Sequence, residues 1–213
     1  ELNSENLEAL EKGLPNLLQH VDNVKNVYGL PCVVAINAFP TDTKAELDLV
    51  ESKCRELGVN VRLSEVWAKG GEGGLALAEE VVRLCDEPNH FQFVYDVNDS
   101  IEDKLNAIAT KVYHADGVVI AASAKKQLKQ LTELGFDKLP ICMAKTQFSF
   151  SDDASKLGAP RGFKITVRDL KVNAGAGFLV AKTGDIMTMP GLPKVPSAEK
   201  IDVDENGKIT GLF

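Results

Sequence analysis

Apolar residues near the start of the chain recur every three or four positions, which is the spacing of one face of an α-helix. The sequence Gly13-Leu14-Pro15 interrupts this pattern. We therefore expect two helices, the second with Pro15 in its first turn and ending at Gly29, because proline suits the start of a helix and glycine its end. The positions that carry the pattern are Leu7, Leu10, Leu14, Leu17, Leu18, Val21, Val24 and Val27.

Short apolar segments rich in β-branched residues then alternate with longer segments of helical spacing. The first of them, residues 31–38, is apolar almost throughout, as in a strand covered on both faces of a parallel sheet. This alternation is typical of right-handed β-α-β units and predicts an α/β fold: a Rossmann-like, three-layer domain with a parallel sheet over residues 1–145. Strands or extended segments are expected at residues 31–38, 59–66, 91–95, 117–121 and 139–145, and helices at residues 43–57, 75–86, 100–112 and 123–134.

The pattern changes after residue 145, where polar loops and short apolar alternations replace the helices. Residues 173–178 contain a Gly-x-Gly turn, and three prolines within residues 190–196 exclude regular helix or sheet there. We expect residues 146–213 to form a mixed, loop-rich C-terminal extension packed on the same domain. Its predicted strands are residues 162–172, 179–182 and 185–188, and an Asn-Gly pair predicts a hairpin over residues 201–209.

The charge balance limits the kinds of partner. With 24 Lys and Arg against 31 Asp and Glu, the net charge is −7, so no net positive field attracts nucleic acid or an anionic membrane. No apolar run approaches the roughly 20 residues of a membrane-spanning helix. The four cysteines and three histidines lack the spacing of a metal site. We expect a cytoplasmic protein with no nucleic-acid partner, no membrane partner and no metal site.

Two loops that follow predicted strands carry unusual residues. In an open parallel sheet, ligands bind where the carboxyl ends of the strands lead into helices. Phe39 and Pro40 follow the first strand, and Trp67, the single tryptophan, follows the second. If these strands are neighbours, the two rings form a slot for a flat heteroaromatic ligand, at about 0.5–1.5 kcal/mol per aromatic contact beyond area burial. The alternative is that Phe39 packs beneath the next helix, which Thr41 or Asp42 is expected to cap.

The loop after Trp67 contains four glycines in the five residues 70–74. Such a loop can approach a ligand closely or hold an anion on its amides, and the alternative is a flexible loop that only begins the helix. Lys69 and Glu72 either pair with each other in solvent or contact polar groups of a ligand. The loop is neither a P-loop nor a dinucleotide-binding Gly-x-Gly-x-x-Gly motif. Other cations near polar or Gly-rich loops, which the sequence does not rank, are Lys145, Arg161 and Arg168.

Four blocks of sequence, in order along the whole chain, resemble formate–tetrahydrofolate ligase (10-formyltetrahydrofolate synthetase). The closing Gly211-Leu212-Phe213 resembles the C-terminus of that family. Only the C-terminal portion of the family is covered, because its members are much longer and carry an ATP-binding P-loop in their N-terminal portion. The chain begins with Glu1 and has no P-loop, so we expect a fragment. The blocks are residues 35–43 (AINAFPTDT), 66–74 (VWAKGGEGG), 139–147 (LPICMAKTQ) and 189–193 (MPGLP).

The resemblance implies an ATP-dependent ligase that makes 10-formyltetrahydrofolate from formate and tetrahydrofolate through formyl phosphate. Phe39 and Trp67 match the aromatic residues that stack on the pterin. ATP and Mg belong to the full-length enzyme, which is a homotetramer in this family, and none is expected to bind this chain tightly. No catalytic residue is expected here, and the chain alone is predicted to be inactive. The expected folate site comprises Phe39, Trp67, Pro40, Leu63, Lys69, Gly70, Gly71 and Glu72.

Two other functions stay open at this point. A non-catalytic folate-binding or interface module would leave an apolar patch exposed where a partner docks. A nucleotide-binding α/β oxidoreductase would use the Gly-x-Gly turn at residues 173–178, although the third glycine and a following helix are missing.

Overall fold

The computed structural model describes residues 4–184, 186 and 194–211. Parallel strands and helices make up most of its regular structure, so the predicted α/β class is confirmed. The strands do not form one parallel sheet, however. They divide between a two-stranded sheet, a four-stranded sheet and a small terminal hairpin.

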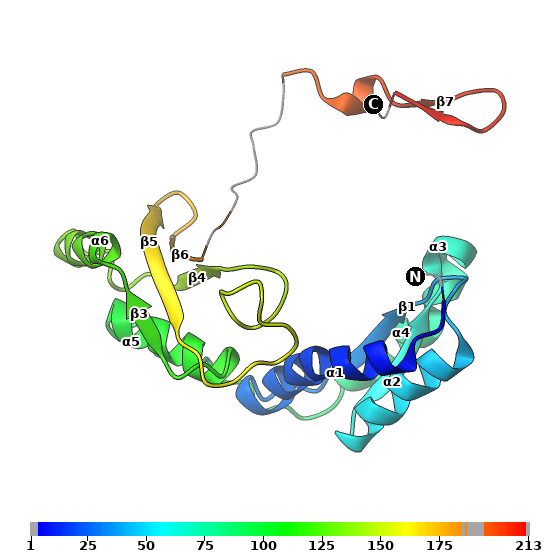
Figure 1. The fold of residues 1–213 in the computed structure, drawn as a ribbon, viewed down its shortest axis with the longest axis horizontal. Coiled ribbons are helices and arrows are strands. Elements are labelled where there is room, and N and C mark those ends of the chain that lie inside the picture. The colour runs from blue at the N-terminus through cyan, green and yellow to red at the C-terminus, as the bar shows by residue number, and fades with distance from the viewer. Residues whose placement is uncertain (1–3, 185, 187–193, 212–213) are drawn as a thin grey trace.

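The first sheet pairs β1 (Val33–Asn37) with β2 (Asn60–Ser64) in parallel. Helices α1 (Leu7–Asp22) and α2 (Lys44–Glu56) cover one face of this sheet (Figure 1). The other face contacts α4 (Leu75–Cys85) through Glu80, whose carboxylate bonds side chains of β2. Ala35 of β1 stays exposed, so the prediction that residues 31–38 are covered on both faces was wrong. The buried core of this sheet consists of Val21, Val34, Cys54, Val59 and Val61.

Helix α1 is continuous, although two helices were expected. Asn6 begins it by accepting a hydrogen bond from the N–H of Ala9, and Pro15 lies inside it. An internal proline costs about 3 kcal/mol because it removes one N–H and crowds the preceding turn. The burial of Leu14 and Val21 on the same helix offsets this local cost. The helix runs on into a π-helical turn, η1 (Asn23–Val27), before Gly29 ends it at φ 70°.

The second sheet has the strand order β3-β5-β6-β4. Its centre is an antiparallel pair, β5 (Ile165–Asn173) and β6 (Phe178–Thr183), with β3 (Val118–Ile120) parallel to β5 and β4 (Ile141–Ala144) parallel to β6. The two central strands come from beyond residue 145 and the two edge strands from before it. The division of the chain at residue 145 stays a prediction. The turn at residues 173–178 joins β5 to β6 and opens no helix.

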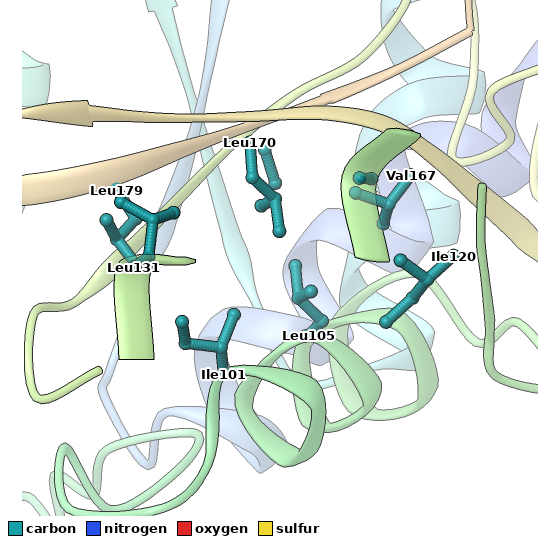
Figure 2. Packing of buried hydrophobic residues seen from close by; sticks show 9 residues of the cluster. Ile101, Leu105, Ile120, Leu131, Val167, Leu170 and Leu179 are labelled. Carbon is teal, nitrogen blue, oxygen red and sulfur yellow. The ribbon is translucent and has the colours of Figure 1, made fainter. Parts of the chain in front are cut away.

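Two helices pack on this second sheet. They are α5 (Ile101–Ala107), which continues as a π-helical turn η3 (Ile108–Val112), and α6 (Ala122–Glu133). Figure 2 shows their apolar side chains meeting those of β3, β5 and β6. The buried residues of this core are Ile101, Leu105, Ile120, Ala124, Leu131, Val167, Leu170, Leu179 and Ala181.

The remaining elements are short. Helix α3 (Val66–Lys69) and a 3₁₀ turn η2 (Gly70–Gly74) replace the expected irregular loop between β2 and α4. Residues 91–93 have no regular secondary structure and residues 94–95 form a bend, so no described strand occurs at the expected position. Strands β7 (Asp202–Val203) and β8 (Ile209–Thr210), after the 3₁₀ turn η4 (Ser197–Glu199), form the predicted hairpin. The strand expected at residues 185–188, Ile186 excepted, and the block at residues 189–193 lie outside the described residues.

Candidate functional site

The carboxyl ends of β1 and β2 lie side by side, which meets the condition on which the predicted aromatic slot depended. The two strands run parallel and in register to their last residues, where Asn37 pairs with Ser64. The N–H of Ala38 then bonds the carbonyl of Ser64 at 3.1 Å and extends the ladder by one residue. The loops that leave this edge therefore start from adjacent points.

The rings of Phe39 and Trp67, one from each loop, lie next to each other. Their centroids are 6.5 Å apart and their planes are inclined by 31°. Phe39 is 57% exposed and Trp67 58% exposed, so the alternative that Phe39 packs beneath the next helix was wrong. A flat molecule held between two ring planes needs them about 7 Å apart, twice the contact distance of carbon atoms. The 6.5 Å between the ring centroids is slightly shorter than this spacing and the planes are not parallel, so the rings must align and move slightly apart before a flat ligand fits between both faces.

Both rings are held through the backbone that follows β1. The indole N–H of Trp67 donates to the carbonyl of Ala38 at 2.8 Å. The N–H of Phe39 donates to Oδ2 of Asp42, also at 2.8 Å. Sequence reasoning missed these contacts and expected Thr41 or Asp42 to cap the next helix. Thr43 caps α2 instead, which leaves the carboxylate of Asp42 facing Phe39.

The glycines of the loop after Trp67 have different roles. Gly70 has φ 61° and ψ −147°, a conformation that is open only to glycine. A Cβ on Gly73 would lie 2.5 Å from the backbone of Glu65, whose N–H bonds the carbonyl of Gly73. A Cβ on Gly74 would lie 2.9 Å from Val66. Gly71 has no positive φ, and a Cβ there would meet no atom within 4 Å, so the fold does not require glycine at this position.

The charges beside the aromatic pair are arranged differently from the expectation. Lys69 pairs with Glu65, one helical turn earlier, at 2.7 Å, and not with Glu72. In the part of the chain that the structure describes, the Glu72 side chain has no hydrogen bond or ion pair. Its carboxylate is exposed at the tip of the Gly-rich loop and is available to a ligand. Leu63, on β2, and Pro40 are also exposed.

An ion cluster around the buried Glu80 fixes α4 behind this loop. The carboxylate of Glu80, which is 4% exposed, accepts hydrogen bonds from Arg83, Asn60 and Arg62. These donors, Arg83 first, lower the pKa of Glu80 from its ordinary 4.5 to about 2. Glu80 therefore stays charged near neutral pH and ties α4 to β2.

The other cations singled out from the sequence lie elsewhere in the fold. Lys145 donates to the carbonyls of Thr146 and Ser149, and burial lowers its pKa. Arg161 donates to Gln19 at 2.6 Å. Lys145 and Arg168 line a separate cavity of about 980 Å³ beside the second sheet. None of the three lines the Phe39–Trp67 pair.

The described residues lack the features of two other classes of site. Residues 4–184, 186 and 194–211 contain no group of three or more His, Cys, Asp or Glu side chains arranged to hold a metal ion. Over the same ranges, no helix combines the length and the apolar character that crossing a bilayer requires.

A comparison with protein-family models identifies the family of the chain. One model, described as formate–tetrahydrofolate ligase, matches residues 1–213. The match spans both sheets and the aromatic pair, and it agrees with the resemblance in the four sequence blocks. The chain belongs to the formate–tetrahydrofolate ligase family.

Proposed function

We propose that this chain forms the folate side of a formate–tetrahydrofolate ligase and binds the pterin ring of tetrahydrofolate between Phe39 and Trp67. The observation that carries this proposal is the pair of half-exposed rings, 6.5 Å apart, at the adjoining carboxyl ends of β1 and β2. The pyrimidine half of the reduced pterin stays flat and conjugated, although the other ring is saturated at two carbons, so this half gains from stacking on both sides.

The details of the site favour a stacked ligand. The indole N–H of Trp67 is already bonded to Ala38, so the residue offers its ring face rather than its polar edge. Leu63 and Pro40 add exposed apolar surface. Beyond the rings, Glu72 offers a carboxylate without a cationic partner among the described residues, and Gly71 leaves room for a ligand. A carboxylate suits the N–H donors on the edge of a pterin.

In this proposal the groups that bind ATP and Mg for the ligase reaction are not among the described residues. ATP phosphorylates formate, and N10 of tetrahydrofolate attacks the carbon of formyl phosphate, so that inorganic phosphate leaves and N10 loses its proton. The sequence has no P-loop, and the described residues hold no metal-ligating cluster. We therefore assign the Mg·ATP-dependent step to an N-terminal portion of a longer cytoplasmic, homotetrameric enzyme. Residues of this chain bind and orient the folate, and the chain alone is expected to be inactive.

Titration with tetrahydrofolate, followed by the fluorescence of Trp67, tests the proposal. We expect saturable quenching in the parent chain and about tenfold weaker binding in Phe39→Ala. The loss of one stacking partner removes about 0.5–1.5 kcal/mol beyond the area it buries, and 1.4 kcal/mol is a factor of ten. Trp67→Ala loses the fluorophore, so its affinity is measured by calorimetry.

A matched control comes from another exposed aromatic pair. Phe91 and Phe93 lie 5.0 Å apart, edge to face, and Phe93 is 80% exposed. Phe93→Ala should leave tetrahydrofolate affinity unchanged. A folded parent without quenching, or equal loss of affinity in Phe39→Ala and Phe93→Ala, would contradict the proposed slot. ATP-dependent formyl transfer by the purified chain would contradict its inactivity.

A non-catalytic interface role has one observation in its favour. Helix α4 exposes Leu75, Val81 and Val82, and the first and last of these share a face because they are seven residues apart. Sedimentation of the parent and of Val82→Lys tests whether this face associates. A folded chain that associates through it without binding tetrahydrofolate would favour the interface role over the folate role.

A further inference from the structure

The peptide unit between Ala38 and Phe39 is hydrogen-bonded at both of its ends. Its carbonyl, on Ala38, accepts the indole N–H of Trp67 at 2.8 Å. Its N–H, on Phe39, donates to the carboxylate of Asp42 at 2.8 Å. The C=O and N–H of one peptide lie in a single rigid plane. A rotation of that plane therefore misaligns both hydrogen bonds together.

This peptide is the first after β1 that makes no hydrogen bond to the neighbouring strand. The preceding N–H, on Ala38, still bonds Ser64 in the ladder of the sheet. Beyond it, the chain turns at Pro40 toward α2. The orientation of the plane between Ala38 and Phe39 thus depends on Trp67 and Asp42.

Asp42 is itself well anchored. Its N–H donates to the carbonyl of Phe39 at 3.0 Å and closes a four-residue turn in which Pro40 occupies the second position, where its fixed φ favours the turn. The next residue, Thr43, begins α2 through a reciprocal capping box with Glu46. The Asp42 carboxylate is therefore connected to the start of a capped helix.

From this geometry we propose that Asp42 is the positioning residue of the aromatic pair: by holding one peptide plane, it sets where both rings lie. The Phe39 ring follows the plane because its Cα is bonded to the nitrogen of that peptide. The Trp67 ring follows it through the carbonyl of Ala38. A carboxylate that accepts from the N–H also polarises the peptide and makes its carbonyl a stronger acceptor for the indole.

Three substitutions of Asp42 separate its hydrogen bond from its charge. Asp42→Ala removes the acceptor. Asp42→Asn keeps an acceptor oxygen at the same reach without the charge, and Asp42→Glu keeps the charge but displaces it by one methylene. Asp48→Ala is the matched control, because Asp48 lies on the exposed side of α2 and pairs only with Lys44 in the described part of the chain.

The first measurement is the near-ultraviolet circular dichroism of the indole, taken on the 213-residue chain without ligand. Trp67 is the single tryptophan, so the long-wavelength band reports its orientation alone. We expect the band to be largely lost in Asp42→Ala and Asp42→Glu and kept in Asp42→Asn and Asp48→Ala. Far-ultraviolet spectra should stay the same in all four, since the turn is exposed. If Asp42→Ala fails to fold, the indole band of Asp42→Glu is compared with that of Asp42→Asn instead.

The second measurement is tetrahydrofolate affinity by calorimetry, and this arm rests on the proposed function. Loss of the acceptor for the Phe39 N–H should weaken binding about tenfold in Asp42→Ala, with Asp42→Asn close to the parent because its side-chain oxygen still accepts that hydrogen bond. An unchanged indole band in folded Asp42→Ala, or equal damage by Asn and Ala, overturns the positioning role. A parent that binds no tetrahydrofolate refutes the proposed function, while the indole band still decides the role of Asp42.

Discussion

The side-chain nitrogen of Gln19 lies 2.6 Å from Nε2 of His114, 95 positions later in the chain. Arg161 can only donate, and it bonds the Gln19 oxygen at 2.6 Å. The amide nitrogen of Gln19 therefore faces the histidine and donates to it. Nε2 of His114 also lies 3.3 Å from Oδ1 of Asn23, but the shorter contact, with Gln19, is a hydrogen bond only when Nε2 is unprotonated, so it favours a neutral imidazole between α1 and the segment after η3.

Mild acid is expected to destabilise the fold through this contact. Burial and Arg161 lower the pKa of His114 from 6.5, and Asp22 opposes them. The unfolded chain then binds the proton more readily than the folded one, so the stabilisation is complete above about pH 6.5 and declines as the pH falls through the folded pKa. Urea unfolding at about pH 7.5 and about pH 5.5 should give a lower free energy of unfolding at the lower pH.

The variant His114→Asn isolates this contribution. His114 has φ 55°, a left-handed conformation that asparagine tolerates better than most residues. The variant should lose part of the pH dependence between those two conditions. Burial and Lys145 also lower the pKa of His20, so His20→Asn measures the second contribution. A pH dependence in His114→Asn equal to that of the parent would refute the assignment.

Replacing the buried lysine of α5 should weaken the second sheet's core. Lys104 is fully buried and its ammonium donates to the carbonyls of Val97, Asp137 and Leu139. Lys104→Met would leave these acceptors without a donor, at roughly 1–3 kcal/mol for each that stays buried. We expect a loss of about 3 kcal/mol in urea unfolding. Lys125→Met, on the exposed side of α6, should change stability by less than about 0.5 kcal/mol, and similar losses in both variants would contradict the prediction.

Local sequence signals predicted most elements of the fold because their causes are local. The apolar spacing of residues 43–57 and the glycine at position 58 suffice to place α2 within a residue or two. Strand partners depend on the whole chain, and this is where the prediction of a single sheet was wrong. Nothing in the short strands β3 and β4 indicates that β5 and β6 separate them. Likewise, the burial of Leu14 and Val21, which keeps Pro15 inside α1, is a tertiary effect.

The candidate site was predictable to the level of its rings. Residue type and position after two successive strands singled out Phe39 and Trp67, and their meeting depended on the pairing of those strands, which the sequence left as a condition. Their positioning by Asp42 and Ala38 was not predicted, because a carboxylate near a helix start usually indicates a cap, and a backbone carbonyl has no sequence signal. The pairing of Lys69 with Glu65 follows the four-residue spacing of a helix, but that helix, α3, was expected to be irregular.

Acid should also release α4 from β2 at a lower pH. The pKa of Glu80 is about 2 in the fold against an ordinary 4.5, so its contribution is present above about pH 4.5 and is lost as the pH falls toward 2. Glu80→Gln should lower the melting temperature at neutral pH, because Arg62 loses its anionic partner and Arg83 keeps only Glu87, and the deficit should shrink at about pH 3. Glu79→Gln, an exposed neighbour, is the control. A deficit that does not change with pH would show that packing, rather than charge, is responsible.

Alanine substitutions in the Gly-rich loop should separate the glycine that serves a ligand from those that serve the fold. Gly73→Ala places a Cβ 2.5 Å from the backbone of Glu65, so the loop must shift and both stability and tetrahydrofolate affinity should fall. Gly71 has no positive φ, and the methyl group of Gly71→Ala would have no atom within 4 Å. This variant should therefore leave stability unchanged or raise it by about 0.4–1 kcal/mol, since alanine restricts the unfolded chain. Its tetrahydrofolate affinity, measured by calorimetry, should nevertheless fall, because the added methyl occupies ligand space. Full affinity in a stable Gly71→Ala would instead mean that the ligand passes elsewhere over the loop.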